Sequence, residues 1–287
     1  MNLTHLSFDL PTILTLVVGV FAFTFVRYVL FSGLWYMVSY HWLREWFQPH
    51  KLNARYPDAK TILGELKLGT LNLVNFGIFA VVILWLQVKG YTQVYTEVER
   101  FGWGYLVASL AIVFVVQDAY FYWLHRLLHT RFFMKHVHGA HHRFRNPTPF
   151  AAFAVHPIEG AAEVAFRPLI LCLLPLHPIA IGIYVVASFV INVFGHGGVE
   201  VLPRGSTRGL ITGLFNTPTH HYQHHKYVVS NFSLYFTWWD KLCGTEQAAY
   251  HEEFDEKAIS LDDLLPEAPA PAPELIASCS ARISPLR

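Results

Sequence analysis

Histidines at short, regular spacings are the residues of this sequence that could do chemistry. The chain holds 17 histidines among its 287 residues. Because positions i, i+3 and i+4 share one face of a helix, a cluster with these spacings can direct two or three imidazoles at one point. Imidazole is the commonest protein ligand for metal ions near neutral pH. The motifs HRLLH, HGAHH and HYQHH therefore predict metal ligation by His125, His129, His138, His141, His142, His221, His224 and His225.

Eight imidazoles exceed the capacity of one metal ion, since a zinc site takes four ligands. The motifs therefore predict two ions, and imidazole suits iron, zinc, copper and nickel. His196, in FGHGG, is either a ninth ligand or a helix-end histidine before a Gly-Gly turn. The three cysteines are too few and too scattered for a cysteine-rich metal site or a disulfide scaffold.

The remaining composition indicates a polytopic membrane protein. The chain is 53% hydrophobic and 14% charged, whereas an ordinary soluble domain is about 25% charged. The net charge of +1 excludes a nucleic-acid binder that works through a strongly basic surface.

A helix needs about 20 apolar residues to cross a bilayer. The N-terminal region, 1–117, contains three such stretches, at about 12–36, 68–88 and 101–117. No Gly or Pro follows Gly104 until Gly139, so the third helix is expected to continue past the bilayer. Pro175 and Pro178 interrupt the fourth apolar stretch, and a membrane hairpin is expected within 161–195.

Basic residues concentrate in 38–67 and 118–146, which the positive-inside rule places in the cytoplasm. For the histidine motifs to meet there, the chain must cross the membrane an even number of times between HGAHH and FGHGG, and the hairpin provides this. Arg27, inside the first span, is expected to face protein or to snorkel. The Pro/Ala-rich tail, 262–287, is expected to be disordered.

Between Asp118 and Thr245, the order and spacing of the motifs resemble the fatty acid hydroxylase/sterol desaturase superfamily of integral membrane di-iron enzymes. The motifs are DAYFYWLHRLLH, HGAHH, NPTPFAAFAVHPIEG, GHGG, HHYQHHK and FTWWDKLCGT. The NPTPF…HPIEG stretch is similar to the C-5 sterol desaturase branch. The resemblance implies an all-α fold of about four transmembrane helices. It also implies a cytosolic helical cap, within 118–250, that holds two iron ions on the eight motif histidines and His196.

The resemblance also implies a reaction, in which O2 and two external electrons are used to attack an unactivated C–H bond of a lipid. The outcome is hydroxylation or desaturation, and the motifs do not decide between them. The sequence has no His-Pro-Gly-Gly haem segment, no Gly-x-Gly-x-x-Gly and no four-cysteine set. Electrons are therefore expected from cytochrome b5, ferredoxin or rubredoxin docked on the basic cytosolic face. Zinc could replace iron in a purified sample.

Five further residues are candidates for supporting roles. Asp118 lies two turns before the HRLLH motif, where it could hold a ligand imidazole or mark the membrane boundary. By motif position, His156 and Glu159 are expected to support the site or organise its loop. Glu200 stands where some relatives have a histidine, and is a ligand, a hydrogen-bond acceptor or neither. Asp240 is expected to pair with an arginine.

Two other functions fit a histidine-rich membrane protein. A zinc-dependent membrane hydrolase is disfavoured because no His-Glu-x-x-His occurs. A metal transporter is disfavoured because its ligands would lie inside the spans. For the lipid substrate, sterol, hopanoid, fatty acyl chain, ornithine lipid and carotenoid all stay open. The short loops and the long tail favour a bacterial inner membrane, with the endoplasmic reticulum as the eukaryotic equivalent.

Overall fold

The computed structural model describes residues 7–264. Within them the chain is mostly helical, and isolated β-bridges take the place of any strand. The predicted all-α class is therefore confirmed. Four helices are long and apolar enough to cross a membrane, namely Leu10–Trp42, Ala59–Val88, Gly102–Leu128 and Pro178–Gly195. Most of the expected disordered tail, 262–287, lies outside the described residues, and its start forms part of α14 (Leu261–Leu264).

The first span is helix α1 (Leu10–Met37), which continues through a π-helical turn, η1 (Val38–Trp42). Asp9 caps its N-terminus by accepting the Thr12 amide at 2.9 Å. A proline in the first turn costs nothing, because no amide donor is needed there. The helix therefore extends beyond the expected 12–36 at both ends.

The helix of the second span begins before the apolar stretch that marks the span in the sequence. Helix α3 (Ala59–Asn72) leads directly into α4 (Val74–Val88), so that 30 residues form one candidate span in place of the expected 68–88. Asp58 caps α3 by accepting the Thr61 amide at 2.8 Å. The cap sets the start of the helix, whereas hydropathy marks only the part without charged residues.

The third span, α5 (Gly102–Leu128), confirms that this helix runs on past 117 into the first histidine motif. The expected hairpin is also present. Helices α8 (Pro157–Val164) and α9 (Phe166–Leu173) lead away from the histidines, and α10 (Pro178–Gly195) returns.

Loop contacts hold the hairpin turn at the end of the bundle remote from the cap. The amide of Gln93 donates to the carbonyl of Leu171 at 2.8 Å, and that of Tyr95 donates to Leu176 at 3.2 Å. Both donors lie in the connection between α4 and α5. The hairpin therefore begins and ends at the same end of the helix bundle as the C-terminus of α5.

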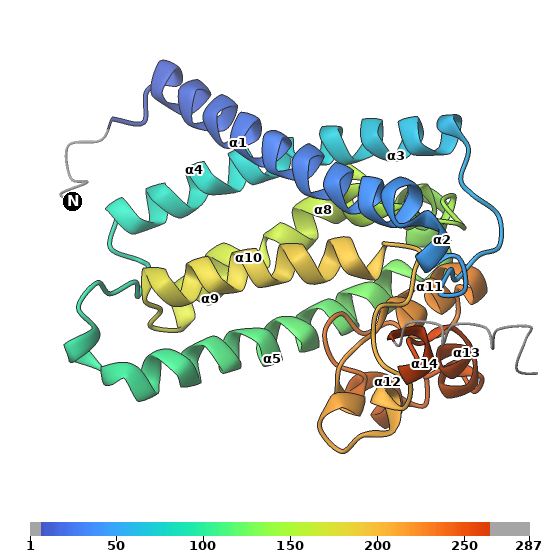
Figure 1. Cartoon of the computed structure of the whole chain (residues 1–287). Coiled ribbons are helices and arrows are strands. Elements are labelled where there is room, and N and C mark those ends of the chain that lie inside the picture. Colours follow the sequence, from blue (N-terminus) through green and yellow to red (C-terminus); the bar gives the residue numbers. More distant parts are fainter. Residues whose placement is uncertain (1–6, 265–287) are drawn as a thin grey trace, which may run out of the picture.

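The long helices run side by side, and most of the remaining elements, apart from α8, α9 and η2, gather at one end as a cap (Figure 1). The longer cap helices are α11 (Pro218–Tyr227), α12 (Trp238–Cys243) and α13 (Tyr250–Lys257). Short elements complete the chain: α2 (Arg44–Phe47), η2 (Val98–Arg100), α6 (Arg131–Phe133), η3 (Met134–His138), α7 (Gly139–His142), η4 (Pro149–Phe153), η5 (Ser206–Arg208) and η6 (Thr212–Leu214).

Candidate metal centre

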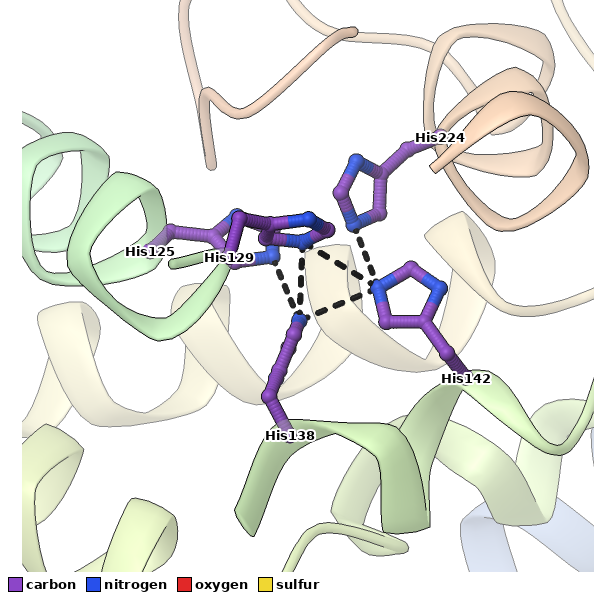
Figure 2. A group of neighbouring side chains, drawn as sticks. All are labelled: His125, His129, His138, His142 and His224. Carbon is purple, nitrogen blue, oxygen red and sulfur yellow. Dashed lines mark hydrogen bonds between the residues drawn. The ribbon is translucent and has the colours of Figure 1, made fainter. Parts of the chain in front are cut away.

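Nine histidines converge at the cap in two groups. Within each group, one nitrogen of every imidazole lies within 4.8 Å of those of the others. The first group, drawn in Figure 2, contains His125, His129, His138, His142 and His224. The second group contains His141, His196, His221 and His225. These are the nine histidines that the sequence nominated, and no other His, Cys, Asp or Glu among the described residues joins either group.

The HGAHH and HYQHH motifs each divide between the two groups. In HGAHH, His138 and His142 belong to the first group and His141 to the second. HYQHH has the reverse division, with His221 and His225 in the second group and His224 in the first. Each motif therefore directs two imidazoles, four residues apart, at one group and its third imidazole at the other, which agrees with the expectation of two or three per point. Neighbouring helical residues are rotated by about 100°, so their side chains face different points.

Helix ends carry the ligands of the first group. His125 lies in the last turn of α5 and His129 is its C-cap residue, one turn further on. The π-helical turn η3 ends at His138, directly before α7. A π-helical turn changes the direction in which successive side chains point, and such turns are frequent at functional sites.

The hairpin delivers His196 to the second group. His196 is the C-cap residue of α10, and its Nε2 lies 2.8 Å from Nε2 of His221 on α11. After it the chain turns at Gly198, which has a φ of +69° and would bring a Cβ onto the Tyr40 hydroxyl. This turn therefore requires glycine both for its backbone conformation and for its space.

Backbone carbonyls orient several of these imidazoles. Because a carbonyl can only accept, each Nδ1 bound to one carries the proton, and the lone pair of Nε2 then faces the other ligands. The carbonyl of Phe232 holds His125 at 2.8 Å, that of Ala154 holds His141 at 3.2 Å, that of Asn192 holds His196 at 2.9 Å, and that of Ser230 holds His224 at 2.8 Å.

The Nε2 atoms of each group also lie close to one another, and those of His125 and His224 face their neighbours as lone pairs because Nδ1 carries the proton. The distance from Nε2 of His125 to that of His138 is 3.1 Å, and that from His224 to His142 is 3.0 Å. Lone pairs at such distances repel each other, and a cation between them removes the repulsion. This donor set fits a pair of metal ions with imidazole ligands.

Burial keeps the histidines neutral, which is the form that binds metal. Desolvation, together with the repulsion that arises when His125 is also protonated, lowers the pKa of His129 to about 2. Desolvation and the neighbouring His196 lower the pKa of His141 to about 3. Burial also lowers the pKa of His221 and His224 well below the usual range.

Glu159 lies against the first group. Its Oε1 is 2.7 Å from Nδ1 of His138, and both side chains are buried. Burial raises the pKa of the Glu159 carboxyl, and a nearby cation would favour its ionised form. His156 caps α8, the helix that carries Glu159, by accepting the Ile158 amide at 3.2 Å.

Asp118 does not contact a ligand imidazole. Its carboxylate accepts the amides of Leu234, Tyr235 and Phe236, and the indole N–H of Trp238 at 3.1 Å. Of the two alternatives for Asp118, direct contact with a ligand imidazole is therefore wrong. Seven residues separate it from His125, or about 10 Å of helix rise, which is beyond the reach of a carboxylate.

Glu200 contacts no ligand either. Its carboxylate accepts the amide and hydroxyl of Thr219, at 3.0 and 2.6 Å, and the amides of Val201 and Leu202. Thr219 lies in the first turn of α11, so Glu200 fixes the start of the helix that bears HYQHH. A negative charge is favourable at that end of a helix.

Among residues 7–264, Asp240 has no arginine partner, so the expected ion pair is not found there. It accepts the amides of Phe232 and Ser233, at 2.8 and 2.9 Å, and the Thr245 hydroxyl at 2.7 Å. It therefore holds the loop whose Phe232 carbonyl orients His125. Its partners lie five to eight residues away across irregular chain segments, so no helical or strand spacing in the sequence indicates this role.

Comparison with known proteins agrees with these features. The fatty acid hydroxylase family model matches residues 110–245. Delta(7)-sterol 5(6)-desaturase of Gibberella zeae is 31% identical over 166 residues, which cover 58% of this chain and 50% of that protein. Lathosterol oxidase of Rattus norvegicus is 32% identical over 163 residues, which cover 56% of this chain and 52% of that protein. Delta(7)-sterol 5(6)-desaturase of Leptosphaeria maculans is 31% identical over 254 residues, which cover 87% of this chain and 66% of that protein.

The chain belongs to the fatty acid hydroxylase/sterol desaturase superfamily. The similarity to C-5 sterol desaturases, predicted from the NPTPF…HPIEG stretch, is also confirmed. The matched region spans about half the length of the first of these curated relatives. No solved structure matches the chain.

In this superfamily member a cavity of about 360 Å³ opens beside both histidine groups. His125 and His138 of the first group line it, as do His141, His196 and His221 of the second. Apolar side chains from the spans form much of the remaining wall. The cavity therefore connects a hydrocarbon-lined space with the two candidate metal positions.

Proposed function

We propose that this protein is a membrane-bound oxidoreductase that uses O2 and two iron ions to hydroxylate or desaturate an unactivated C–H position of a lipid. The observation that carries the proposal is the position of the apolar cavity, which both histidine groups line. A lipid chain in that cavity lies beside both metal positions at once.

The two groups would hold one ion each, with five imidazoles available to the first and four to the second. Bound iron supplies the redox chemistry that activates O2 and removes hydrogen from carbon. The protein keeps its imidazoles neutral and fixes their orientation through the carbonyl groups described above. Exclusion of water from the buried site protects a reactive oxidant from side reactions.

Residues of α10 and of η4 supply part of the substrate-binding wall. Ala152 and Phe153 of η4 line the cavity, as do Val190 and Phe194 of α10. Their side chains offer hydrocarbon contacts and no hydrogen bonds, so they select for an apolar chain. Placement of two adjacent C–H bonds against the metal positions would favour desaturation, and placement of one would favour hydroxylation.

The proposed electron donor is a soluble carrier, cytochrome b5, ferredoxin or rubredoxin, that docks on the cytosolic face. Residues 119–158 contain no Asp or Glu. Five basic side chains of this segment are exposed, and we name them the basic rim: Arg126, Arg131, Lys135, Arg143 and Arg145. His129, the most exposed member of the first group, belongs to the same segment. An acidic carrier would be attracted to this rim.

The experiment combines metal analysis, O2 uptake and lipidomics on cells with and without the gene. We expect two irons per chain and an oxidised lipid that depends on air. The double variant His141→Ala/His224→Ala removes one ligand from each group and should abolish the product. A protein that holds a single zinc and consumes no O2 would instead be a hydrolase or a transporter.

A further inference from the structure

A second cavity, of about 350 Å³, adjoins the first inside the helix bundle. Helices α1, α4, α9 and α10 supply most of its wall, and most of the lining side chains are apolar. The two cavities share five lining residues, and these mark the junction between them: Arg27, Phe76, Val164, Arg167 and Val185.

Two arginines therefore stand at one place in the membrane-spanning part of the protein. The guanidinium of Arg27 lies 4.4 Å from the centre of the Phe189 ring, and that of Arg167 lies 4.8 Å from the centre of the Phe76 ring. Nε of Arg27 is buried and has no hydrogen-bond partner. Charged groups at this depth are costly and mark functional sites.

The protein offsets only part of the positive charge of this arginine pair. Among the described residues, no ion pair joins either guanidinium to a carboxylate. Two acidic side chains line the first cavity, of which Glu159 is engaged with His138. Glu163 is then the one acidic side chain of this cavity that is left to balance the two arginines, so the junction carries more positive than negative charge.

The junction lies at a defined distance from the histidines. Val185 and His196 are eleven residues apart on α10, which corresponds to roughly 16 Å of helix rise. A group bound at the junction would thus hold a lipid chain so that carbons well removed from that group reach the metal positions.

We propose that the substrate is an anionic lipid whose carboxylate or phosphate binds between Arg27 and Arg167, with its hydrocarbon chain extending along the first cavity to the histidines. The proposal rests on the proposed function and names its substrate class. Guanidinium groups bind both anions through paired, charge-assisted hydrogen bonds, which are strongest where water is excluded.

An uncharged sterol has no anionic group that could bind the two arginines at this junction. In a sterol oxidised at positions 5 and 6, the hydroxyl is near the reacting carbons and would lie at the histidine end of the cavity. Neither guanidinium group would then meet an anionic group of the substrate. The arginine pair therefore separates this chain's substrate class from that printed in the names of its relatives.

The test is equilibrium binding to the purified, metal-free full-length chain in nanodiscs of phosphatidylcholine. The probes are oleate, oleyl phosphate and oleyl alcohol, which share one hydrocarbon chain. We expect the wild type to bind one or both anions at least about tenfold more tightly than the alcohol. The tighter of the two anions identifies a carboxylate or a phosphate as the natural group.

The double variant Arg27→Gln/Arg167→Gln should reduce this preference to within about twofold of unity, with the affinity for the alcohol little changed. Arg100→Gln, on the exposed α4–α5 connection, is the matched control and should keep the full preference. If the double variant does not fold, the single variants Arg27→Gln and Arg167→Gln should each lose part of the preference.

Equal binding of oleate, oleyl phosphate and oleyl alcohol by the wild type would overturn the proposal, as would an unchanged preference in the double variant. Because neither metal nor O2 is needed, the result is independent of the proposed reaction. An anion preference without any lipid oxidation would contradict the proposed function alone. Oxidation of a neutral lipid without an anion preference would contradict only this inference.

Discussion

The carboxylate of Glu159 and Nδ1 of His138 lie 2.7 Å apart in the buried interior of the cap. Glu159 comes from α8, a helix of the hairpin, whereas His138 ends η3 in the cap. The contact therefore couples the membrane hairpin to the first metal group. An acceptor at Nδ1 fixes the ring and strengthens Nε2 as a ligand.

Removal of this acceptor should weaken the first group. We expect Glu159→Ala to lower its metal affinity by about 10- to 100-fold, and Glu159→Gln to lower it less because an amide oxygen still accepts. Metal titration of the purified protein measures both. Glu252→Ala, on the exposed face of α13, is the control. Equal affinities in the Ala variant and the wild type would rule out this role.

Adjacent histidines should control different metal ions. His142 belongs to the first group and His141 to the second. We expect His142→Ala to lose the first ion and keep the second, and His141→Ala to do the opposite. Mössbauer spectroscopy of iron-loaded protein, with metal content per chain, distinguishes the two. The division between the groups is wrong if both variants lose the same spectral component.

Asp118→Ala should destabilise the loop around Tyr235. The substitution leaves buried amide donors without an acceptor, and each such donor costs about 1–3 kcal/mol. We expect a lower unfolding temperature and a secondary loss of metal, because the same loop carries the Phe232 carbonyl. Thermal unfolding in detergent measures the first effect. Asp118→Asn, which retains one acceptor oxygen, should unfold at an intermediate temperature.

The metal-free protein should lose stability as the pH falls below about 6.5. Burial lowers the pKa of His129 to about 2 and that of His141 to about 3, so the unfolded chain takes up protons that the folded chain does not. Stability is then complete above the unfolded pKa and is lost below it. The loss is at most about 2 kcal/mol per histidine at pH 5. Denaturant midpoints at pH 7, 6 and 5 measure this, and a constant midpoint would contradict it.

Charge reversal on the basic rim should weaken electron delivery without changing the chemistry. We expect Arg131→Glu/Lys135→Glu to raise KM for an acidic carrier about tenfold, with less effect at high salt. Turnover driven by dithionite should stay at the wild-type rate. Lys60→Glu, exposed near the start of α3, is the control. An unchanged KM in the rim variant would place the donor elsewhere.

The helices and the candidate ligands could be predicted from the sequence because both depend on local pattern. Hydropathy located the spans, and Pro175 and Pro178 marked the hairpin. Helix boundaries were less accurate, since α3 begins at a cap and not where the apolar run begins. Histidine spacing nominated nine residues that the structure brings together.

The sequence by itself therefore determined a four-span α-helical protein and the residues of a histidine-rich centre. Only the tertiary structure decided how HGAHH and HYQHH divide between two groups, because that depends on which faces of separate helices meet. The same holds for Asp118, whose partners lie more than a hundred residues away. It holds also for Arg27 and Arg167, which share a cavity junction through packing between spans. The spacing of residues along one helix determines the direction in which their side chains point. Which side chains of separate helices meet depends on how the whole chain packs.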